Sequence, residues 1–250
     1  MIIIKKHNAF QLKMLLALLM VLDHLQTIPE LLSPNMIMIF HILTRCVGVF
    51  FAYMAVEGFH YTRNRIKYNG RLFFWAGVVF IGNTILNQLF KGSGISLSHN
   101  IFFTLALGIL MLNLLAFNTK NGWLNILIKG VLTIVVLFVG ISFAEGGAVI
   151  LPFILITYLF RDKNVLRNVL YVSLSAILLF MSYVPYETLE MTISMMGYNS
   201  DWLFITVFPL LHLYNGERGP KTKFSKYFFY VFYPAHLWIL GIIGYLTTIN

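Results

Sequence analysis

The sequence is a succession of apolar runs, each long enough or nearly long enough to cross a lipid bilayer. A membrane-spanning helix needs ~20 mostly apolar residues, with a range of ~17–25. Only 11% of the residues are charged and 59% are hydrophobic, whereas a soluble domain is about 25% charged and about 45–50% apolar. A water-soluble fold of this length could not bury so much apolar side chain, so the sequence predicts an integral membrane protein.

We predict an all-α, polytopic transmembrane helical bundle of about nine spans, formed as a single integral membrane domain over residues 1–250. The spans are expected at residues 10–28, 36–60, 72–90, 101–118, 124–143, 147–160, 166–184, 201–214 and 227–249. The sixth and eighth segments are short, which is typical of tilted, half-inserted or broken helices. No small-residue cleavage site follows the first segment, so we interpret it as an uncleaved anchor.

Positive charges are concentrated in alternate loops of this predicted topology. Cytoplasmic loops carry the excess of Lys and Arg, which places the N-terminus in the cytoplasm and Asn250 outside. Lys91 stands alone on the other side, and Arg45 lies within a span. The net charge of +9 therefore indicates topology, and no nucleic-acid partner is expected. Most of these cations are expected to face water and the lipid bilayer, and the alternative for some is a phosphorylated ligand.

Ionisable residues inside the first two spans are the strongest functional signal. A charge in hydrocarbon costs at least ~2.5–3.5 kcal/mol, so it needs a partner or a wet cavity. Asp23 and His24 are adjacent and point about 100° apart, so one can face a cavity while the other pairs with a neighbouring helix. His41 and Arg45 are four residues apart and share a helix face. We predict an Asp23–Arg45 pair, either as a structural salt bridge or as part of a reactive site.

Further polar residues fall in the second and third spans. Glu57 and His60 lie near the inner end of the second span, where they are either solvated or line the mouth of a site. Asn83 and Asn87 share one face of the third span. Hydrogen bonding between helices is one interpretation of this asparagine pair, and substrate binding is the other.

The last span contains Tyr233, Pro234 and His236 near its middle. Tyr233 and His236 share a face, and Pro234 removes a backbone hydrogen bond and is expected to kink the helix. His236 is either a core residue or a functional one. No zinc-binding motif, cysteine cluster, nucleophile elbow or phosphate-binding glycine loop is present, so no metal is expected.

Several blocks of the chain resemble the TraX family of membrane proteins. The blocks are Leu12-Lys13 with Asp23-His24; the stretch from Arg45 through Glu57-Gly58-Phe-His60-Tyr-Thr62-Arg63-Asn64 to Tyr68 and Arg71-Leu72; Asn100-Ile-Phe-Phe-Thr104-Leu-Ala-Leu-Gly108; Leu213-Tyr214-Asn215-Gly216-Glu-Arg218-Gly219; and Phe232-Tyr233-Pro234-Ala-His236-Leu237. The sequence departs from the family pattern at Cys46-Val47-Gly48-Val49 and at Glu145-Gly146-Gly147. Neither departure includes a candidate catalytic group.

The resemblance implies an acyltransferase that takes acetyl groups from acetyl-CoA as co-substrate. The founding activity is N-terminal acetylation of pilin, and the family is akin to the membrane acyltransferases of the acyltransferase-3 type. We expect transfer from cytoplasmic acetyl-CoA to an amine or hydroxyl near the outer membrane face, on a pilin or other peptide or on an envelope glycan or lipid. The expected location is the bacterial cytoplasmic membrane.

Under this interpretation the candidate residues divide into three groups. The catalytic candidates are His24 and His236 as general bases, with Asp23 to orient a histidine or neutralise Arg45, and Arg45 to stabilise an oxyanion. The substrate-binding candidates are His41, Glu57, Tyr233, Asn83 and Asn87. The candidates for binding the phosphates of acetyl-CoA are Arg63, Arg65, Arg71, Arg218 and Lys221.

Two other classes of function use the same buried polar residues. A proton-coupled transporter would also need buried His, Asp and Arg, but it would move a solute without acetyl-CoA. Inverted repeats would favour a transporter, and the sequence shows none. A membrane scaffold of a secretion system would use these residues only to lock helices together, so their substitution would change stability alone.

Overall fold

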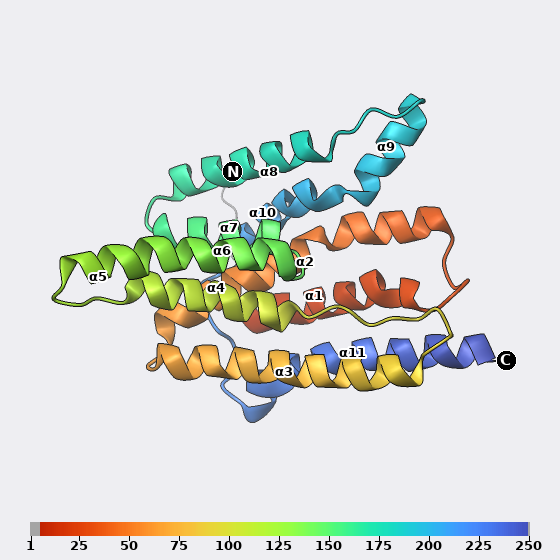
Figure 1. The fold of residues 1–250 in the computed structure, drawn as a ribbon, viewed down its shortest axis with the longest axis horizontal. Helices are drawn as coiled ribbons and strands as arrows, with labels where there is room; N and C mark the ends of the chain where they lie inside the picture. The colour runs from red at the N-terminus through yellow and green to blue at the C-terminus, as the bar shows by residue number, and fades with distance from the viewer. Residues whose placement is uncertain (1–5, 250) are drawn as a thin grey trace. The chain divides into compact units, whose positions relative to one another are not determined.

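The computed structural model describes residues 6–249, and this range is helical with no β-strand. Within this range an isolated backbone bridge joins His7 to Tyr214. The helices, of which η1 and η3 are 3₁₀ and η2 is π, are α1 (Ala9–His24), η1 (Leu25–Thr27), α2 (Pro34–Tyr61), α3 (Arg65–Leu89), α4 (Ile101–Ala116), α5 (Gly122–Ile126), η2 (Leu127–Leu132), α6 (Thr133–Phe143), α7 (Gly147–Leu159), α8 (Asn164–Ser182), α9 (Leu189–Tyr198), η3 (Ser200–Val207), α10 (Phe208–Leu213) and α11 (Lys223–Ile249) (Figure 1).

The predicted all-helical, multi-pass membrane architecture is confirmed. Six helices are long and apolar enough to cross a membrane: Ala9–Thr27, Pro34–Tyr61, Arg65–Leu89, Gly122–Phe143, Asn164–Ser182 and Lys223–Ile249. Three shorter apolar helices, Ile101–Ala116, Gly147–Leu159 and Ser200–Leu213, coincide with the fourth, sixth and eighth predicted segments. Every predicted segment therefore falls on an apolar helix, while the number of spans and their orientation stay predictions.

One helix has no counterpart in the sequence prediction. α9 (Leu189–Tyr198) begins after Thr188, whose hydroxyl accepts a hydrogen bond from the Met191 N–H at 3.1 Å. A threonine in this position satisfies one of the backbone donors that a helix start leaves open. The prediction missed α9 because its 10 residues are far fewer than a membrane span requires.

The chain divides into two compact units, and the boundaries fall inside α2, α3 and α8 and in the loop before α4. Unit 1 comprises residues 6–50, 79–98 and 174–249 of the described chain, and unit 2 comprises residues 51–78 and 99–173. In unit 1, α1 packs along α11 (Figure 1). α11 also packs on η1, where Gly244 permits a close approach, because a Cβ atom there would lie 2.6 Å from the backbone oxygen of Thr27. Small residues at such positions let membrane helices approach each other closely.

In unit 2, helices α4, α6 and α7 pack against one another (Figure 1). Gly147, at the start of α7, faces the backbone of Gly140 in α6, and a side chain there would overlap the Gly140 carbonyl. Tyr171 of α8 is fully buried, and its hydroxyl lies 2.7 Å from the Thr157 hydroxyl of α7. A glycine contact and a buried hydroxyl pair thus join the helices of unit 2.

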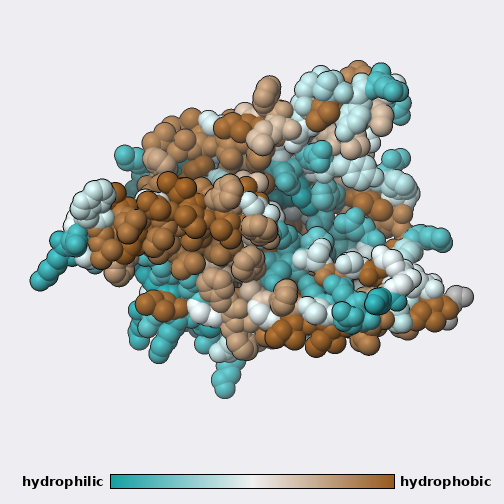
Figure 2. All heavy atoms as spheres, in the orientation of Figure 1, coloured by the Kyte–Doolittle hydropathy of each residue, from teal (hydrophilic) through white to brown (hydrophobic). Residues whose placement is uncertain are grey.

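The outer surface of the α5–η2–α6 segment is apolar. Ile126, Ile134 and Phe138 are each more than 60% exposed, and Figure 2 shows apolar side chains gathered over this segment. A soluble protein rarely exposes so continuous an apolar surface. This surface is what a helix in contact with lipid tails requires.

Candidate functional site

The predicted ion pair between the first two long helices is present in unit 1. Arg45 of α2 places Nη2 3.5 Å from Oδ2 of Asp23 near the end of α1. Both side chains are about one-fifth exposed, at 19% and 20%. A buried arginine keeps its charge, so a carboxylate beside it removes most of the cost of holding it in the membrane.

A second carboxylate, which the sequence analysis missed, completes the pairing of Arg45. Oδ1 of Asp201, at the start of η3, lies 3.0 Å from Nη1 of Arg45. The Asp201 side chain is 49% exposed, so it is the more solvent-accessible of the two carboxylates that contact Arg45. The sequence did show an acidic residue at the edge of the eighth predicted segment. It did not indicate that Arg45 would be the partner of this carboxylate.

His41 and Thr44 close the network around Asp23 and Arg45. The Thr44 hydroxyl donates to Oδ1 of Asp23 at 2.7 Å, and Nε of Arg45 donates to the His41 carbonyl at 3.0 Å. Nδ1 of His41 lies 3.0 Å from Nη2 of Arg45 and 3.4 Å from Oδ1 of Asp23. Nδ1 of His41 thus lies between a guanidinium that can only donate and a carboxylate that can only accept. We call these four residues, together with Asp201, the arginine network.

The two central histidines meet next to this network. His24 ends α1, directly after Asp23, and its ring centroid lies 5.1 Å from that of His236 in α11, with the rings at 79°. Both side chains are buried, with only 5% and 6% exposed. Asp23 pairs with α2 while His24 contacts α11, so the predicted pairing of one residue with a neighbouring helix is present, while the predicted cavity stays a prediction.

Backbone contacts determine which nitrogen of each histidine carries the proton. Nδ1 of His24 lies 2.8 Å from the Met20 carbonyl oxygen, and Nδ1 of His236 lies 3.0 Å from that of Phe232. A carbonyl oxygen only accepts, so both Nδ1 atoms hold a proton, and in the neutral rings Nε2 is the basic nitrogen. The structure therefore places two imidazoles, each with the same tautomer, side by side in a buried site.

Aromatic side chains surround His236. The Phe232 ring stacks on it at 5.1 Å and 16°, and the Tyr233 ring meets it edge-on at 5.6 Å. The predicted shared face of Tyr233 and His236 is therefore confirmed. Apolar rings exclude water from an imidazole, which strengthens its interactions with a reacting group.

The predicted asparagine pair forms two structural contacts within unit 1. Oδ1 of Asn83 accepts a hydrogen bond from Nε1 of Trp238 in α11 at 3.0 Å. Asn87 binds the backbone of Leu97 through both its amide nitrogen, at 2.9 Å, and its oxygen, at 2.8 Å. The interhelical interpretation is confirmed for Asn83, whereas Asn87 holds a loop.

Glu57 and His60, at the end of α2, belong to unit 2. Oε1 of Glu57 lies 3.7 Å from Nη2 of Arg161. The His60 ring stacks on Tyr158 with centroids 5.4 Å apart and an angle of 19°. These contacts tie the end of α2 to the region where α7 ends.

The predicted phosphate-binding cations are distributed over both units. Arg218 and Lys221 are exposed and lie between α10 and α11 in unit 1. The backbone holds this segment against the N-terminal residues, because Ala9 N–H donates to the Glu217 oxygen at 2.8 Å and Asn215 N–H to the His7 oxygen at 2.9 Å. In unit 2, Arg65 lies over the Phe59 ring at 4.5 Å.

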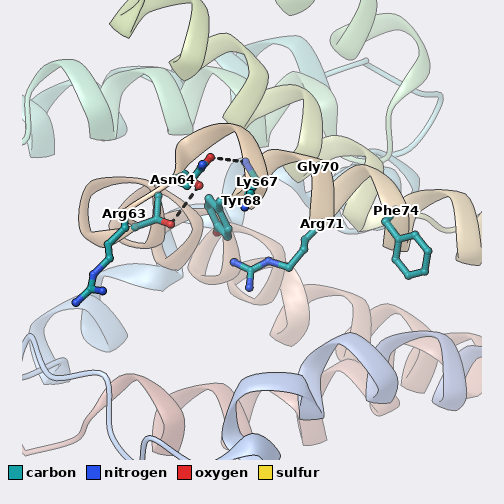
Figure 3. A pocket seen from close by; sticks show the side chains of 8 residues that line it. Arg63, Asn64, Lys67, Tyr68, Gly70, Arg71 and Phe74 are labelled. Atoms are coloured by element: carbon teal, nitrogen blue, oxygen red, sulfur yellow. Dashed lines mark hydrogen bonds between the residues drawn. The ribbon is translucent and has the colours of Figure 1, made fainter.

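Arg63 and Arg71 line a pocket of about 570 Å³ at the start of α3 in unit 2 (Figure 3). Its lining residues are Thr62, Arg63, Asn64, Lys67, Tyr68, Gly70, Arg71 and Phe74. Asn64 caps α3 by accepting a hydrogen bond from the Lys67 N–H at 2.8 Å, drawn as a dashed line in Figure 3. Lys67 was not among the predicted ligand-binding residues, although its spacing of four from Arg71 places both cations on one helix face.

Comparison with known proteins identifies the family. The family model described as "TraX protein" matches residues 9–244. The chain belongs to the TraX family. One curated relative, "Probable fimbrial assembly protein FimC, serogroup H1" of Dichelobacter nodosus, is 25% identical over 243 residues, covering 93% of this chain and 94% of that protein. No solved structure matches the chain.

The resemblance to the TraX family noted in the sequence is thus confirmed, and the family match includes every block that suggested it. The matched range also includes the whole arginine network and the histidine pair. These two clusters come from α1, α2, η3 and α11, so this chain assembles its candidate site from both ends of its sequence.

Proposed function

We propose that this TraX protein is a membrane-embedded acetyltransferase, in which the His24–His236 pair moves protons during acetyl transfer to an amine. The observation that carries the proposal is the geometry of the pair. Two buried imidazoles with their Nδ1 protons bound to carbonyls present their basic nitrogens in one site. Histidine is the side chain best suited to proton transfer near neutral pH.

The charge of the arginine network supports an amine as the acceptor. Two carboxylates, Asp23 and Asp201, surround one guanidinium, so negative charge is in excess beside the histidine pair. An excess negative charge attracts a protonated amine more strongly than a neutral hydroxyl. Arg45 then acts as a positioning residue that holds both carboxylates, and Asp23 neutralises Arg45 instead of orienting a histidine.

The pair supplies two bases for the two protons that a protonated amine must lose. One histidine takes the first proton, which is released to solvent, and leaves the neutral amine. As the amine nitrogen attacks the thioester carbonyl, the other histidine takes the second proton at Nε2. The C–N bond forms, the C–S bond breaks, and this proton passes to the leaving thiolate. General-base help of this kind is worth about 10²–10⁴-fold in rate.

Arg218 and Lys221 are our candidates for binding the phosphates of acetyl-CoA. Both are exposed and lie in the same unit as the histidine pair. Arg65 of unit 2 remains a further candidate. Exposed cations suit the nucleotide end of the coenzyme, which carries phosphates and stays in water. This assignment agrees with the predicted topology, in which the N-terminus and this segment face the cytoplasm of a bacterium and about nine spans cross its membrane.

The fimbrial name of the relative in Dichelobacter nodosus favours a peptide acceptor. We therefore propose the N-terminal amine of a pilin or similar subunit, presented near the outer face of the membrane. His41 and Tyr233, which lie in and beside the two clusters, are our candidates for contacting it. An envelope glycan or lipid carrying an amine would satisfy the same charge requirement.

The test is transfer of labelled acetyl from acetyl-CoA by the purified protein in lipid vesicles. We expect label on a peptide amine and at least about tenfold less on a matched hydroxyl acceptor. His24→Ala and His236→Ala should each abolish transfer. His212→Ala is the matched control, because Nδ1 of His212 also contacts a carbonyl, that of Phe208 at 2.7 Å, while its side chain is exposed. Solute movement without any transfer or hydrolysis of label would replace the proposal with a transporter.

A further inference from the structure

The pocket at the start of α3 has a polar end and an apolar end. Lys67, Arg71 and Phe74 follow one another at spacings of four and three, so they lie along one face of α3. The distance from Lys67 to Phe74 along the helix axis is about 10 Å. Figure 3 shows Arg71 reaching back toward Tyr68, with Phe74 one turn further along α3. Arg63 adds a third cation at the polar end.

The apolar end of this pocket is open to the surroundings. Phe74 is 64% exposed. A Cβ atom on Gly70, which lies between Lys67 and Arg71 on the pocket wall, would meet nothing within 4 Å. Since α3 is long and apolar enough to span a membrane, exposed apolar residues along it face lipid.

Tyr68 gives the polar end a firm wall. Its hydroxyl donates to the Ala55 carbonyl at 3.4 Å. A Cβ atom on Gly58 would lie only 2.9 Å from the Tyr68 hydroxyl oxygen. The Arg71 guanidinium lies over the Tyr68 ring at 5.7 Å. A tyrosine held against α2 in this way limits where the Arg71 side chain can move, so the pocket keeps its cations together.

We propose that this pocket binds an anionic glycerophospholipid, with the headgroup phosphate at Arg63, Lys67 and Arg71 and an acyl chain along Phe74. Basic pockets at the end of a membrane helix attract anionic headgroups. The phosphates of acetyl-CoA could bind the same three cations. The nucleotide of the coenzyme, however, would make no favourable contact with the apolar, lipid-facing wall at Phe74. The assignment replaces the predicted coenzyme role of Arg63 and Arg71, and it does not depend on acetyl transfer.

The test measures lipid binding to the purified protein in detergent by native mass spectrometry. Phosphatidylglycerol and phosphatidylcholine are titrated separately, and the bound fraction is compared. We expect the wild-type protein to prefer phosphatidylglycerol. Lys67→Gln with Arg71→Gln should weaken that binding by about fivefold for each cation removed, or about 25-fold for the pair. Gly70→Phe keeps the charge but fills the groove, and it should weaken binding by at least about fivefold.

The control is Lys120→Gln with Lys163→Gln, which removes two exposed cations that do not line the pocket. This control should retain wild-type preference for phosphatidylglycerol. Equal binding of the two lipids, or an equal loss in the control, would overturn the proposal. Displacement of phosphatidylglycerol by coenzyme A from the wild-type protein would overturn it too, because the pocket would then belong to the acyl donor. A Cβ atom at position 70 meets nothing within 4 Å, so Gly70→Phe tests the site even if the charge variants fold poorly.

Discussion

Nη1 of Arg45 and Oδ1 of Asp201 lie 3.0 Å apart, although 156 residues separate them in the chain. This contact joins α2 to the segment that follows α9, and Asp23 joins the same guanidinium to α1. Three largely apolar segments, α1, α2 and η3, thus meet at the guanidinium of Arg45. The arginine network is therefore both a structural junction of unit 1 and the neighbour of the histidine pair.

The two carboxylates of the arginine network should differ in their contribution to stability. Asp23 is 20% exposed and Asp201 is 49% exposed. Removing Asp23 leaves Arg45 with only the half-exposed Asp201 as its counter-ion, so we expect the larger cost there, whereas a half-exposed pair contributes about 0–1 kcal/mol. We expect Asp23→Asn to lower the unfolding midpoint in detergent clearly and Asp201→Asn to lower it little. An equal effect of both substitutions would contradict this ranking.

The histidine pair should behave as one catalytic unit. If His24 and His236 share the proton transfers, His24→Ala alone should cost nearly as much acetyl transfer as both substitutions together. The expected loss for each is about 10²–10⁴-fold in rate. The measurement is a double-mutant cycle on acetyl transfer, with the unfolding midpoint as the control for folding. Additive losses would indicate that the two histidines act independently.

Gly147 should be the most sensitive small residue of unit 2. A side chain at this position would overlap the Gly140 carbonyl, and backbone cannot move aside as a flexible side chain can. We expect Gly147→Ala to destabilise the protein by about 1–3 kcal/mol. Gly77→Ala is the matched control, because its Cβ atom meets nothing within 4 Å and alanine favours a helix by up to ~1 kcal/mol. Thermal unfolding of the purified protein distinguishes the two.

The hydroxyl pair of Thr157 and Tyr171 should contribute measurably to unit 2. The two oxygens lie 2.7 Å apart, and Tyr171 is fully buried with its ring stacked on Phe153 at 4.4 Å. Tyr171→Phe keeps the stacking and removes only the hydroxyl, so it should cost about 0.6–1.7 kcal/mol. Tyr183→Phe, at a tyrosine that is 55% exposed, should leave the unfolding midpoint unchanged. A double-mutant cycle of Tyr171→Phe with Thr157→Val, measured on the free energy of unfolding, isolates the contribution of the hydrogen bond between the two hydroxyls.

Much of the candidate site followed from the cost of placing charge in hydrocarbon. Arg45 needed an opposite charge at a similar depth, and Asp23 in the preceding span was the available carboxylate, so their pairing could be predicted. The one-face relationships of His41 with Arg45 and of Tyr233 with His236 followed from helical periodicity. Thr44 and Lys67 were not predicted, because a polar residue near a helix end or on a face is too common to indicate a role.

The sequence by itself determined that this chain is helical and where its apolar helices lie, because the length of an apolar run and its period are local properties. Only the tertiary structure decided which helices meet. Asp201 reaches Arg45, and His24 faces His236, because packing contacts such as Gly244 against the Thr27 backbone choose among many pairings of similar apolar surfaces. That choice depends on shape complementarity over the whole unit, which no single segment of the sequence contains.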